Sequence, residues 1–304
     1  MTQTYTALQW LFFFYLYSFI GWCYESAYVS IRKRRWVNRG FMRGPMLPLY
    51  GSGAVMMLVV SAPFQDSIIL TYLAGCVGAT LLEYVTGVTM EALFKVRYWD
   101  YSSRKFNLQG HICLEATLAW GLFTVIMTKL VHHPIETLVL SMPYLLVKII
   151  TIIITVLAVS DFTLSFKTAL DLRDVLVKME GLKDELDRLQ KRLDVIIAFA
   201  EDSKEQVIQN TSQRADEMIE SIEEKFRKVK EMIPKLEISE EKREEIAELR
   251  IKYRINKENR FQLSHMKDFY RKAMIKGNPT MVSVKFKESL EEIKKAAMES
   301  RKKK

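Results

Sequence analysis

Long apolar runs fill the first half of the chain and predict membrane-spanning helices. A helix that crosses a bilayer needs about 20 mainly apolar residues. Five stretches approach this length, at residues 5–28, 46–62, 68–90, 112–131 and 138–159. The second stretch is short, so a re-entrant segment is an alternative to a full crossing there. We therefore expect an all-α, polytopic membrane domain with about five spans.

Beyond residue 160 the apolar positions alternate spacings of three and four residues. Charged residues lie between them over about four heptads, a pattern typical of a coiled-coil seam. The seam consists of Leu172, Val175, Met179, Leu182, Leu186, Leu189, Leu193, Ile196 and Ala200. We predict a homo-oligomer through this coiled coil. The alternative is that residues 211–233 of the same chain pack back onto the seam.

The rest of the tail predicts shorter elements. Pro234 breaks the apolar pattern, and a charged helix is expected over residues 240–270. A turn is expected at Gly277-Asn278-Pro279, followed by a frayed basic helix over residues 285–304. The sequence thus predicts a transmembrane domain, residues 1–160, followed by a charged coiled-coil tail, residues 161–304.

Charge gives the expected orientation in the membrane. Residues 1–160 carry 12 Lys and Arg, and ten of these lie in two loops. The first loop holds Arg32, Lys33, Arg34, Arg35, Arg39 and Arg43, and the second holds Lys95, Arg97, Arg104 and Lys105. The positive-inside rule places both loops in the cytoplasm. We expect a plasma-membrane protein with its N-terminus outside, outward loops around Asp66 and around His132-His133-Pro134, and a cytoplasmic tail.

Several classes of chemistry lack their sequence motifs. No G-x-x-x-x-G-K-[ST] occurs, so the chain has no Walker A loop, and G-x-G-x-x-G, H-E-x-x-H and G-x-S-x-G are absent too. The three cysteines lie in apolar segments without a CxxC spacing, as expected for buried apolar residues. His132, His133 and Glu136 form a weak metal candidate, for which an exposed polar loop is the favoured interpretation. We expect no cofactor, no metal and no nucleic acid partner.

Polar residues of the apolar half converge on the predicted cytoplasmic side. The candidate functional cluster comprises Glu25, Asn38, Arg39, Arg43, Glu83, Asp100, Asn107, His111 and Glu115. The alternative is that they are interfacial caps and salt bridges that lock the helices. For Glu91 we expect such a bridge to Lys95 at i+4. Glu115 is suited to complement a helix N-terminus.

Glu83 and Lys148 lie deeper in the apolar stretches. A charge at the bilayer centre costs about 2.5–3.5 kcal/mol on insertion scales, so each needs a reason. We predict that Glu83 pairs with Arg39 or Arg43, because arginine can bind a carboxylate through two parallel hydrogen bonds. Lys148 lies at mid-membrane if the last span covers residues 138–159. It snorkels outward if the span covers residues 143–166, which is the preferred alternative.

Several motifs recur in an order typical of one family. They include Gly21-Trp22-x-x-Glu25, Asn38-Arg39-Gly40-Phe41-x-x-Gly44-Pro45-x-x-Pro48-x-Tyr50-Gly51, Leu82-Glu83-Tyr84, Glu91-x-x-Phe94, Trp99-Asp100-Tyr101 and Phe106-Asn107-x-x-Gly110-x-Ile112-Cys113-Leu114. Over roughly residues 8–160 the chain resembles the CmpB-like family of bacterial ABC-transporter permeases. The family pattern has Gly-Arg-Ile-Cys where this chain has His111. A neutral imidazole replaces a permanent cation only in part.

Three functional hypotheses follow, ranked in this order. The resemblance implies a permease-like membrane subunit that lacks its own ATPase and needs a separate ATPase subunit. The charged tail indicates a membrane-anchored scaffold or sensor that acts through the coiled coil. The clustered acids and bases indicate an inner-leaflet membrane enzyme, with Glu25, Glu83, Asp100 and His111 as acid–base candidates. Membrane lipid is a partner in all three cases.

Overall fold

The computed structural model describes residues 5–201, 214–232, 240–265 and 268–299, and these residues are almost entirely helical. The predicted all-α fold class is therefore confirmed. The chain forms two compact units. The first unit combines Met1–Leu172 with Asp268–Lys285, and the second combines Arg173–Lys267 with Phe286–Lys304. A short segment from the far end of the chain thus belongs to the unit that holds the apolar helices.

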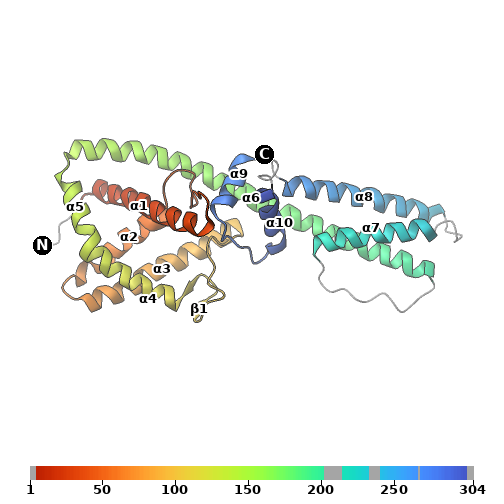
Figure 1. Cartoon of the computed structure of the whole chain (residues 1–304), viewed down its shortest axis with the longest axis horizontal. Coiled ribbons are helices and arrows are strands. Elements are labelled where there is room, and N and C mark those ends of the chain that lie inside the picture. The colour runs from red at the N-terminus through yellow and green to blue at the C-terminus, as the bar shows by residue number, and fades with distance from the viewer. Residues whose placement is uncertain (1–4, 202–213, 233–239, 266–267, 300–304) are drawn as a thin grey trace. The chain divides into compact units, whose positions relative to one another are not determined.

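The first unit is built from helices that pack side by side (Figure 1). Its helices are α1 (Ala7–Lys33), α2 (Pro48–Ser61), the 3₁₀ turn η1 (Ala62–Phe64), α3 (Ile68–Phe94), α4 (Leu114–Ile126), the π-helical turn η2 (Met127–Val131), α5 (His132–Ser141), the first part of α6 (Tyr144–Glu201), and α9 (Phe269–Gly277). A two-residue hairpin pairs β1 (Asn107–Leu108) with β2 (Ile112–Cys113), with Asn107 opposite Cys113. Apart from this hairpin, helix packing defines the unit.

Small residues set the spacing between neighbouring helices of this unit. A Cβ on Gly21 of α1 would come within 2.3 Å of Tyr50, and one on Gly51 of α2 within 2.4 Å of the Phe14 carbonyl oxygen. Between α3 and α4, a Cβ on Gly75 would lie 2.2 Å from the Thr124 hydroxyl. Glycine is therefore required where these backbones approach, as is common for helices packed in a bilayer.

Three helical stretches of the described chain are long and apolar enough to cross a membrane: Ile68–Phe94, Leu114–Ser141 and Tyr144–Ile196. The apolar helix Pro48–Phe64 is shorter. Helix α1 has 27 residues, but it is not one of the three. The predicted count of five spans is therefore not confirmed, whereas several apolar helices of membrane length are present.

The expected outward loop at His132-His133-Pro134 is wrong, because these residues form the start of α5. A proline inside a helix lacks an N–H and clashes with the carbonyl four residues earlier. The widened turn η2 immediately precedes α5, and the His132 N–H bonds to the Met127 carbonyl five residues back. This turn accommodates Pro134, so the chain reverses only at Met142.

Helix α6 runs without a break for 58 residues, from the last apolar stretch into the charged tail. It begins at Tyr144, and Lys148 lies one turn inside it with an exposed side chain. This start favours the alternative in which Lys148 snorkels toward the nearby end of the helix.

In the second unit, the predicted seam is buried by the same chain. Leu186, Leu189 and Leu193 of α6 pack against Ile222 of α7 (Ala215–Met232), and Leu249 and Tyr253 of α8 (Glu240–Ser264) complete the cluster. This is the packing-back alternative, with α8 as an additional contributor. The side chain of Ala200 lies outside the described residues.

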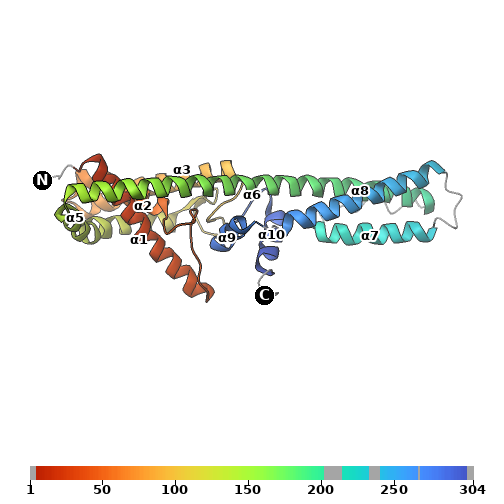
Figure 2. The ribbon, with the colours of Figure 1, turned by 90° about the horizontal axis from the view of Figure 1, so that it is seen from above.

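The last helix, α10 (Lys287–Glu299), is packed rather than frayed as expected. Its Leu290 and Ile293 are buried. Ala296 and Ala297 are buried as well, and Lys294 is buried while it pairs with Glu291, so a helix of basic composition can still be packed. In Figure 2 the labels α6, α7, α8 and α10 identify the elements of this unit.

Candidate functional site

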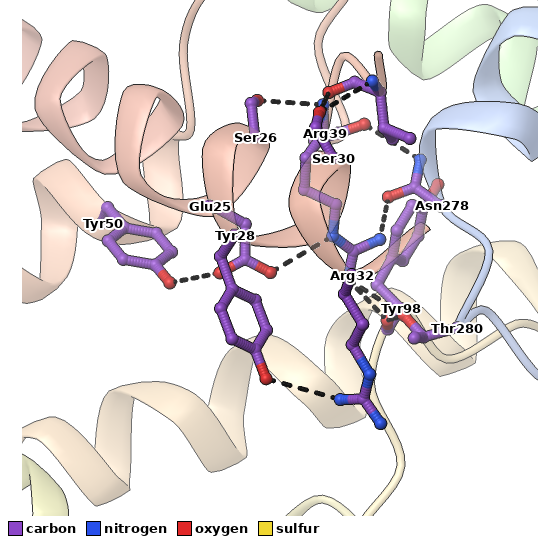
Figure 3. Close-up of polar contacts among 12 residues, drawn as sticks. Glu25, Ser26, Tyr28, Ser30, Arg32, Arg39, Tyr50, Tyr98, Asn278 and Thr280 are labelled. Atoms are coloured by element: carbon purple, nitrogen blue, oxygen red, sulfur yellow. Dashed lines mark hydrogen bonds and ion pairs between the residues drawn. The ribbon is translucent and has the colours of Figure 1, made fainter. Parts of the chain in front are cut away.

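Arg39 is the centre of a polar network in the loop between α1 and α2 (Figure 3). Its Nε lies 3.3 Å from Oε1 of Glu25, and Tyr50 donates a 2.7 Å hydrogen bond to the other oxygen of this carboxylate. The backbone N–H of Arg39 donates to Ser26 at 3.1 Å. These bonds join Arg39 to helix α1. Only 11% of the Arg39 side chain is exposed.

The remaining donors of Arg39 bind the segment that follows α9. Nη1 donates to Oδ1 of Asn278 at 2.7 Å, and Nη2 donates to the Thr280 hydroxyl and the Tyr98 carbonyl oxygen at 3.1 and 3.3 Å. Asn278 is 1% exposed, and its Nδ2 donates to the Gly40 carbonyl at 2.9 Å. Four N–H groups of the guanidinium therefore have acceptors, two of them side chains more than 230 positions further along the chain.

The segment Asp268–Lys285, called the strap below, also contacts the loop after α3. Arg97 and Val282 exchange backbone hydrogen bonds of 2.7 and 2.9 Å as an antiparallel bridge. Ser283 donates to the Lys95 carbonyl at 2.6 Å. A Cβ on Gly277 would meet the Asn38 carbonyl oxygen at 2.6 Å. The strap thus joins the two loops that carry ten of the 12 Lys and Arg of residues 1–160.

Asn38 and Arg43 brace the first loop in a different direction. Asn38 accepts from the Trp22 indole N–H at 2.6 Å and donates to the Arg43 carbonyl. Arg43 donates to the Thr168 hydroxyl at 2.8 Å, and its guanidinium lies 3.8 Å from the ring centre of Tyr270. The backbone amides of Arg43 and Gly44 both bind the carboxylate of Asp161 on α6.

A second network lies at the end of α3. Oε2 of Glu91 accepts from Nε of Arg97 at 2.8 Å and lies 3.1 Å from Nε2 of His111. The expected Glu91–Lys95 pair is wrong, because Lys95 is the left-handed C-cap of α3 and leaves the helical face. Arg97 also pairs with Asp100 at 3.4 Å. Arg97 and His111 therefore share one carboxylate oxygen, which places a permanent cation close to the imidazole.

The pKa values of this network follow from its geometry. Burial, and then the charge of Arg97, lower the pKa of His111, and Glu91 offsets only part of this effect. Burial raises the pKa of Asp100, but the hydroxyl and amide of Ser102, together with Arg97, leave that pKa below its ordinary value. A neutral His111 that carries its proton on Nε2 can donate it to Oε2 of Glu91.

Glu83 does not pair with Arg39 or Arg43, so that prediction is wrong. Its carboxylate is buried and accepts from the Tyr101 hydroxyl at 3.0 Å and from the Trp120 indole N–H at 2.9 Å. Two neutral donors replace the expected cation. Arg39 has its own carboxylate in Glu25, which is why it is not available to Glu83.

Asn107 and Glu115 have local structural roles. Asn107 accepts from the Gly110 N–H and donates to the Arg104 carbonyl, which shapes the hairpin. Gly110 has φ +75°, and a Cβ there would meet Asp100 at 2.6 Å. Glu115 lies in the first turn of α4, as expected, and pairs with Arg104 at 3.1 Å. Both side chains of this pair are mostly exposed.

The structure thus divides the predicted cluster into several separately satisfied networks. Sequence reasoning missed Tyr50, Arg97, Asp161, Asn278 and Thr280 as partners. A turn was expected at Gly277-Asn278-Pro279; Gly277 is the last residue of α9, and the turn lies at Pro279 and Thr280. No periodicity indicated that it would meet a loop 239 positions earlier. Among the described residues, no three His, Cys, Asp or Glu side chains are grouped to hold a metal ion.

Comparison with known proteins gives a match to a family model. No curated protein and no solved structure matches the chain. The family described as "Putative ABC-transporter type IV" matches residues 12–166, half of the chain. This range covers the helices from α1 to the apolar part of α6, and it includes every residue of the predicted cluster. The chain therefore belongs to this ABC-transporter-type family of membrane proteins.

Proposed function

We propose that the chain is the membrane-embedded, permease-like subunit of an ABC-type transport system, with ATP hydrolysis supplied by a separate subunit. The family match over residues 12–166 carries this proposal. The sequence has no Walker A loop to bind the β- and γ-phosphates of ATP. A transport cycle of this type therefore needs a partner with that loop.

The proposed topology keeps five crossings, with both cationic loops in the cytoplasm. Helix α1 has 27 residues, so at 1.5 Å per residue it extends roughly 40 Å and is long enough to cross. Pro48–Phe64 has 17 residues, extends roughly 25 Å and would be the shortest crossing. The positive-inside rule supports a cytoplasmic position for the loops around Arg39 and Arg97.

The braced loops are the face that we assign to the ATPase partner. Arg39 and Arg97 hold their loops through partly buried ion pairs, and the strap ties the two loops together. A rigid surface can transmit movement from a partner to the helices that continue from it. Loops without these contacts would absorb such movement.

Affinity purification of the full chain from native membranes in mild detergent tests the proposal. We expect a Walker A-containing protein to co-purify and the complex to hydrolyse ATP. Arg39→Gln should reduce its recovery, whereas Arg104→Gln, at a mostly exposed pair, should retain it. The same purification with an unrelated tagged membrane protein is the control. The proposal would be contradicted if this control recovered as much of a Walker A-containing protein.

The orientation is tested separately with single cysteines. In a variant with Cys23, Cys76 and Cys113 replaced by Ser, a cysteine at Ser102 should resist membrane-impermeant reagents in intact cells. A cysteine at Asp66 should react with them. Labelling of the Ser102 position from outside would overturn the topology.

A membrane-anchored scaffold is the second candidate. The continuous helix α6 favours it, because this helix physically connects the apolar segment to the charged unit. A partner retained by the tail, without any ATPase, would support it. We do not propose an oligomer through the seam, since α7 and α8 take up that surface. An inner-leaflet enzyme ranks third, because the acid–base candidate Glu25 lies in a different network from Asp100 and His111.

A further inference from the structure

The last turns of α1 expose an apolar face next to a run of cations. Its apolar positions recur at spacings of four, four and three residues and so share one face of the helix: Ile20, Tyr24, Tyr28 and Ile31. All four side chains are exposed, and Ile31 is 78% exposed. Figure 2 shows this end of α1 projecting beyond the neighbouring helices of the first unit. Within the described chain, this face therefore stays uncovered up to the last turn of the helix.

Positive charge is concentrated where α1 ends. Residues 32–35 are Arg, Lys, Arg and Arg, and the first three are exposed. Arg32 donates a 3.4 Å hydrogen bond to the Tyr28 hydroxyl, which is a neutral partner (Figure 3). In the part of the chain that the structure describes, no carboxylate forms an ion pair with these four cations. The nearest acid in the sequence, Glu25, pairs with Arg39.

The cationic turn is held against α1 by the residues that follow it. Arg34 ends the helix in the left-handed conformation, with φ of 49°, and the chain then runs back along α1. The Val37 N–H donates to the Ser30 hydroxyl at 2.9 Å, and the ring of Trp36 meets that of Trp22 edge-on, with centroids 6.4 Å apart. Trp36 is nevertheless 75% exposed. The cations therefore lie at a braced tip, with exposed apolar side chains beside them.

The length of α1 places this tip at a membrane surface if the helix crosses as in the proposed topology. Its 27 residues extend roughly 40 Å, whereas the hydrocarbon core of a bilayer is about 30 Å thick. Charged side chains are costly in that core, so the excess length lies at the cationic end. Tryptophan and tyrosine are enriched in the headgroup layer, where cations attract anionic lipids. An acidic protein would match the charge but not an apolar face that continues the side of a crossing helix.

We propose that the end of α1 and the turn after it bind the phosphate-bearing headgroups of anionic phospholipids. The guanidinium groups of Arg32, Arg34 and Arg35 can each donate two parallel hydrogen bonds to phosphate oxygens, and Lys33 adds a further positive charge. The exposed apolar side chains beside them contact the adjoining part of the acyl chains. This inference rests on the crossing of α1 in the proposed topology, and not on transport or on an ATPase.

Quenching of tryptophan fluorescence by brominated lipids tests this site in the full chain. The protein is reconstituted into vesicles of phosphatidylcholine and phosphatidylglycerol in equal amounts, with bromine on the acyl chains of one lipid or the other. The contribution of Trp36 is the signal that is lost in Trp36→Phe. We expect phosphatidylglycerol to quench Trp36 more strongly than phosphatidylcholine at low salt, and this preference to shrink as salt screens the charges. Equal quenching by both lipids at low salt, or quenching by neither, would overturn the proposal.

Charge variants assign the preference to the turn. Arg32→Gln combined with Lys33→Gln keeps Arg34 in its left-handed position and should bring the two lipids close to equal quenching. Each cation near an anionic surface contributes about fivefold to lipid affinity. Continued quenching by phosphatidylcholine will show that this variant is still inserted. Arg104→Gln with Lys105→Gln is the matched control, because it removes the same charge from the second cationic loop and should leave the preference unchanged.

An equal loss of preference in both double variants would assign the effect to total charge and contradict a site at α1. Ile31→Ser, at an exposed apolar position, should weaken the quenching of Trp36 by both lipids without changing their ratio. None of these measurements requires an ATPase, so their result is independent of whether an ATPase co-purifies with the chain.

Discussion

Among single residues, Arg39 shows why a guanidinium differs from any other cation. Four of its N–H groups reach acceptors on three segments, namely Glu25 on α1, Tyr98 after α3, and Asn278 with Thr280 in the strap. The planar fork fixes the angles between these bonds, which a lysine with one ammonium group cannot reproduce. Arg39 therefore determines geometry as well as charge.

The Glu25–Arg39 pair should be strongly coupled in stability. Arg39→Gln strands a mostly buried carboxylate, and we expect a loss of about 3–5 kcal/mol in the free energy of unfolding. Glu25→Gln combined with Arg39→Gln should cost clearly less than the sum of the single changes. Denaturant unfolding in micelles measures this cycle.

The exposed pair of Arg104 and Glu115 provides the control, because Arg104→Gln should cost at most about 1 kcal/mol. Additive effects of the Glu25 and Arg39 changes would contradict the coupling. Glu83→Gln, which shares no hydrogen-bond partner with Arg39, should be additive with Arg39→Gln within about 0.5 kcal/mol.

His111 should make stability depend on pH. Its folded pKa lies below the ordinary value of about 6.5, so the unfolded chain binds a proton first as the pH falls. Stability is therefore fully present above about pH 6.5 and is lost toward the lower folded pKa. His111→Gln should lose less stability than the parent between about pH 7.5 and pH 5.5.

Thermal unfolding of the parent and of His111→Gln in micelles, at about pH 7.5 and about pH 5.5, measures how much stability each protein loses. Equal pH dependence in the parent and in His111→Gln would show that another group is responsible.

The polar residue types near the end of α1 were predictable, but their pairings were not. Glu25 and Arg39 were expected in the same polar cluster, and they form an ion pair. The choice of partner depends on tertiary contacts such as those of Tyr101 and Trp120 with Glu83. Asn278 was predicted only as a turn residue, because the residues next to it in the sequence do not indicate that it binds the Gly40 carbonyl.

At the scale of elements, α1 and α2 approach closely because glycine, whose side chain is a single hydrogen atom, lies at their contact. Gly51 faces the backbone of α1, where a Cβ would meet the Phe14 carbonyl oxygen at 2.4 Å. Gly53, two residues further along the same helix, has nothing within 4 Å of its Cβ position. The two glycines therefore separate the effect of packing from that of helix propensity.

Gly51→Ala should destabilise the first unit by about 1–3 kcal/mol, because backbone atoms cannot move aside as a flexible side chain does. Gly53→Ala should be neutral or stabilising by about 0.5–1 kcal/mol, since alanine favours the helix. Unfolding midpoints of the two variants in the same detergent give the comparison. Similar losses in both would place the effect in the helix itself.

Element boundaries were predicted best where composition changes sharply. The apolar stretch of α3 was placed within a few residues of its ends, because Ser67 caps its start. The break expected at His132-His133-Pro134 failed, since η2 lets a helix continue through a proline. The junction at residue 160 was also not a boundary of α6, because a helix can pass from apolar to charged sequence without interruption.

For the whole molecule, the strap makes the first unit discontinuous in sequence. Asn278→Ala would leave the Gly40 carbonyl without a donor and one Arg39 nitrogen without its acceptor. We expect the Arg97–Val282 bridge to open, so the amides of both residues should exchange hydrogen faster. Val284→Ala, at a side chain that is 64% exposed, is the control.

Hydrogen exchange of the intact chain, followed by mass spectrometry of its peptides, measures how fast the amide hydrogens of Arg97 and Val282 exchange. Protection of Val282 equal to that of the parent would mean that the bridge holds the strap without Asn278.

The strap also imposes an order of events during synthesis. A ribosome adds about 5–20 residues per second, so the 239 positions between Arg39 and Asn278 take roughly 12–48 s. Throughout this interval the Arg39 loop already exists without the acceptors that complete it. A chain that stalls before residue 278 therefore lacks the Asn278 contact at the Arg39 loop, although this loop is among the first parts to be made.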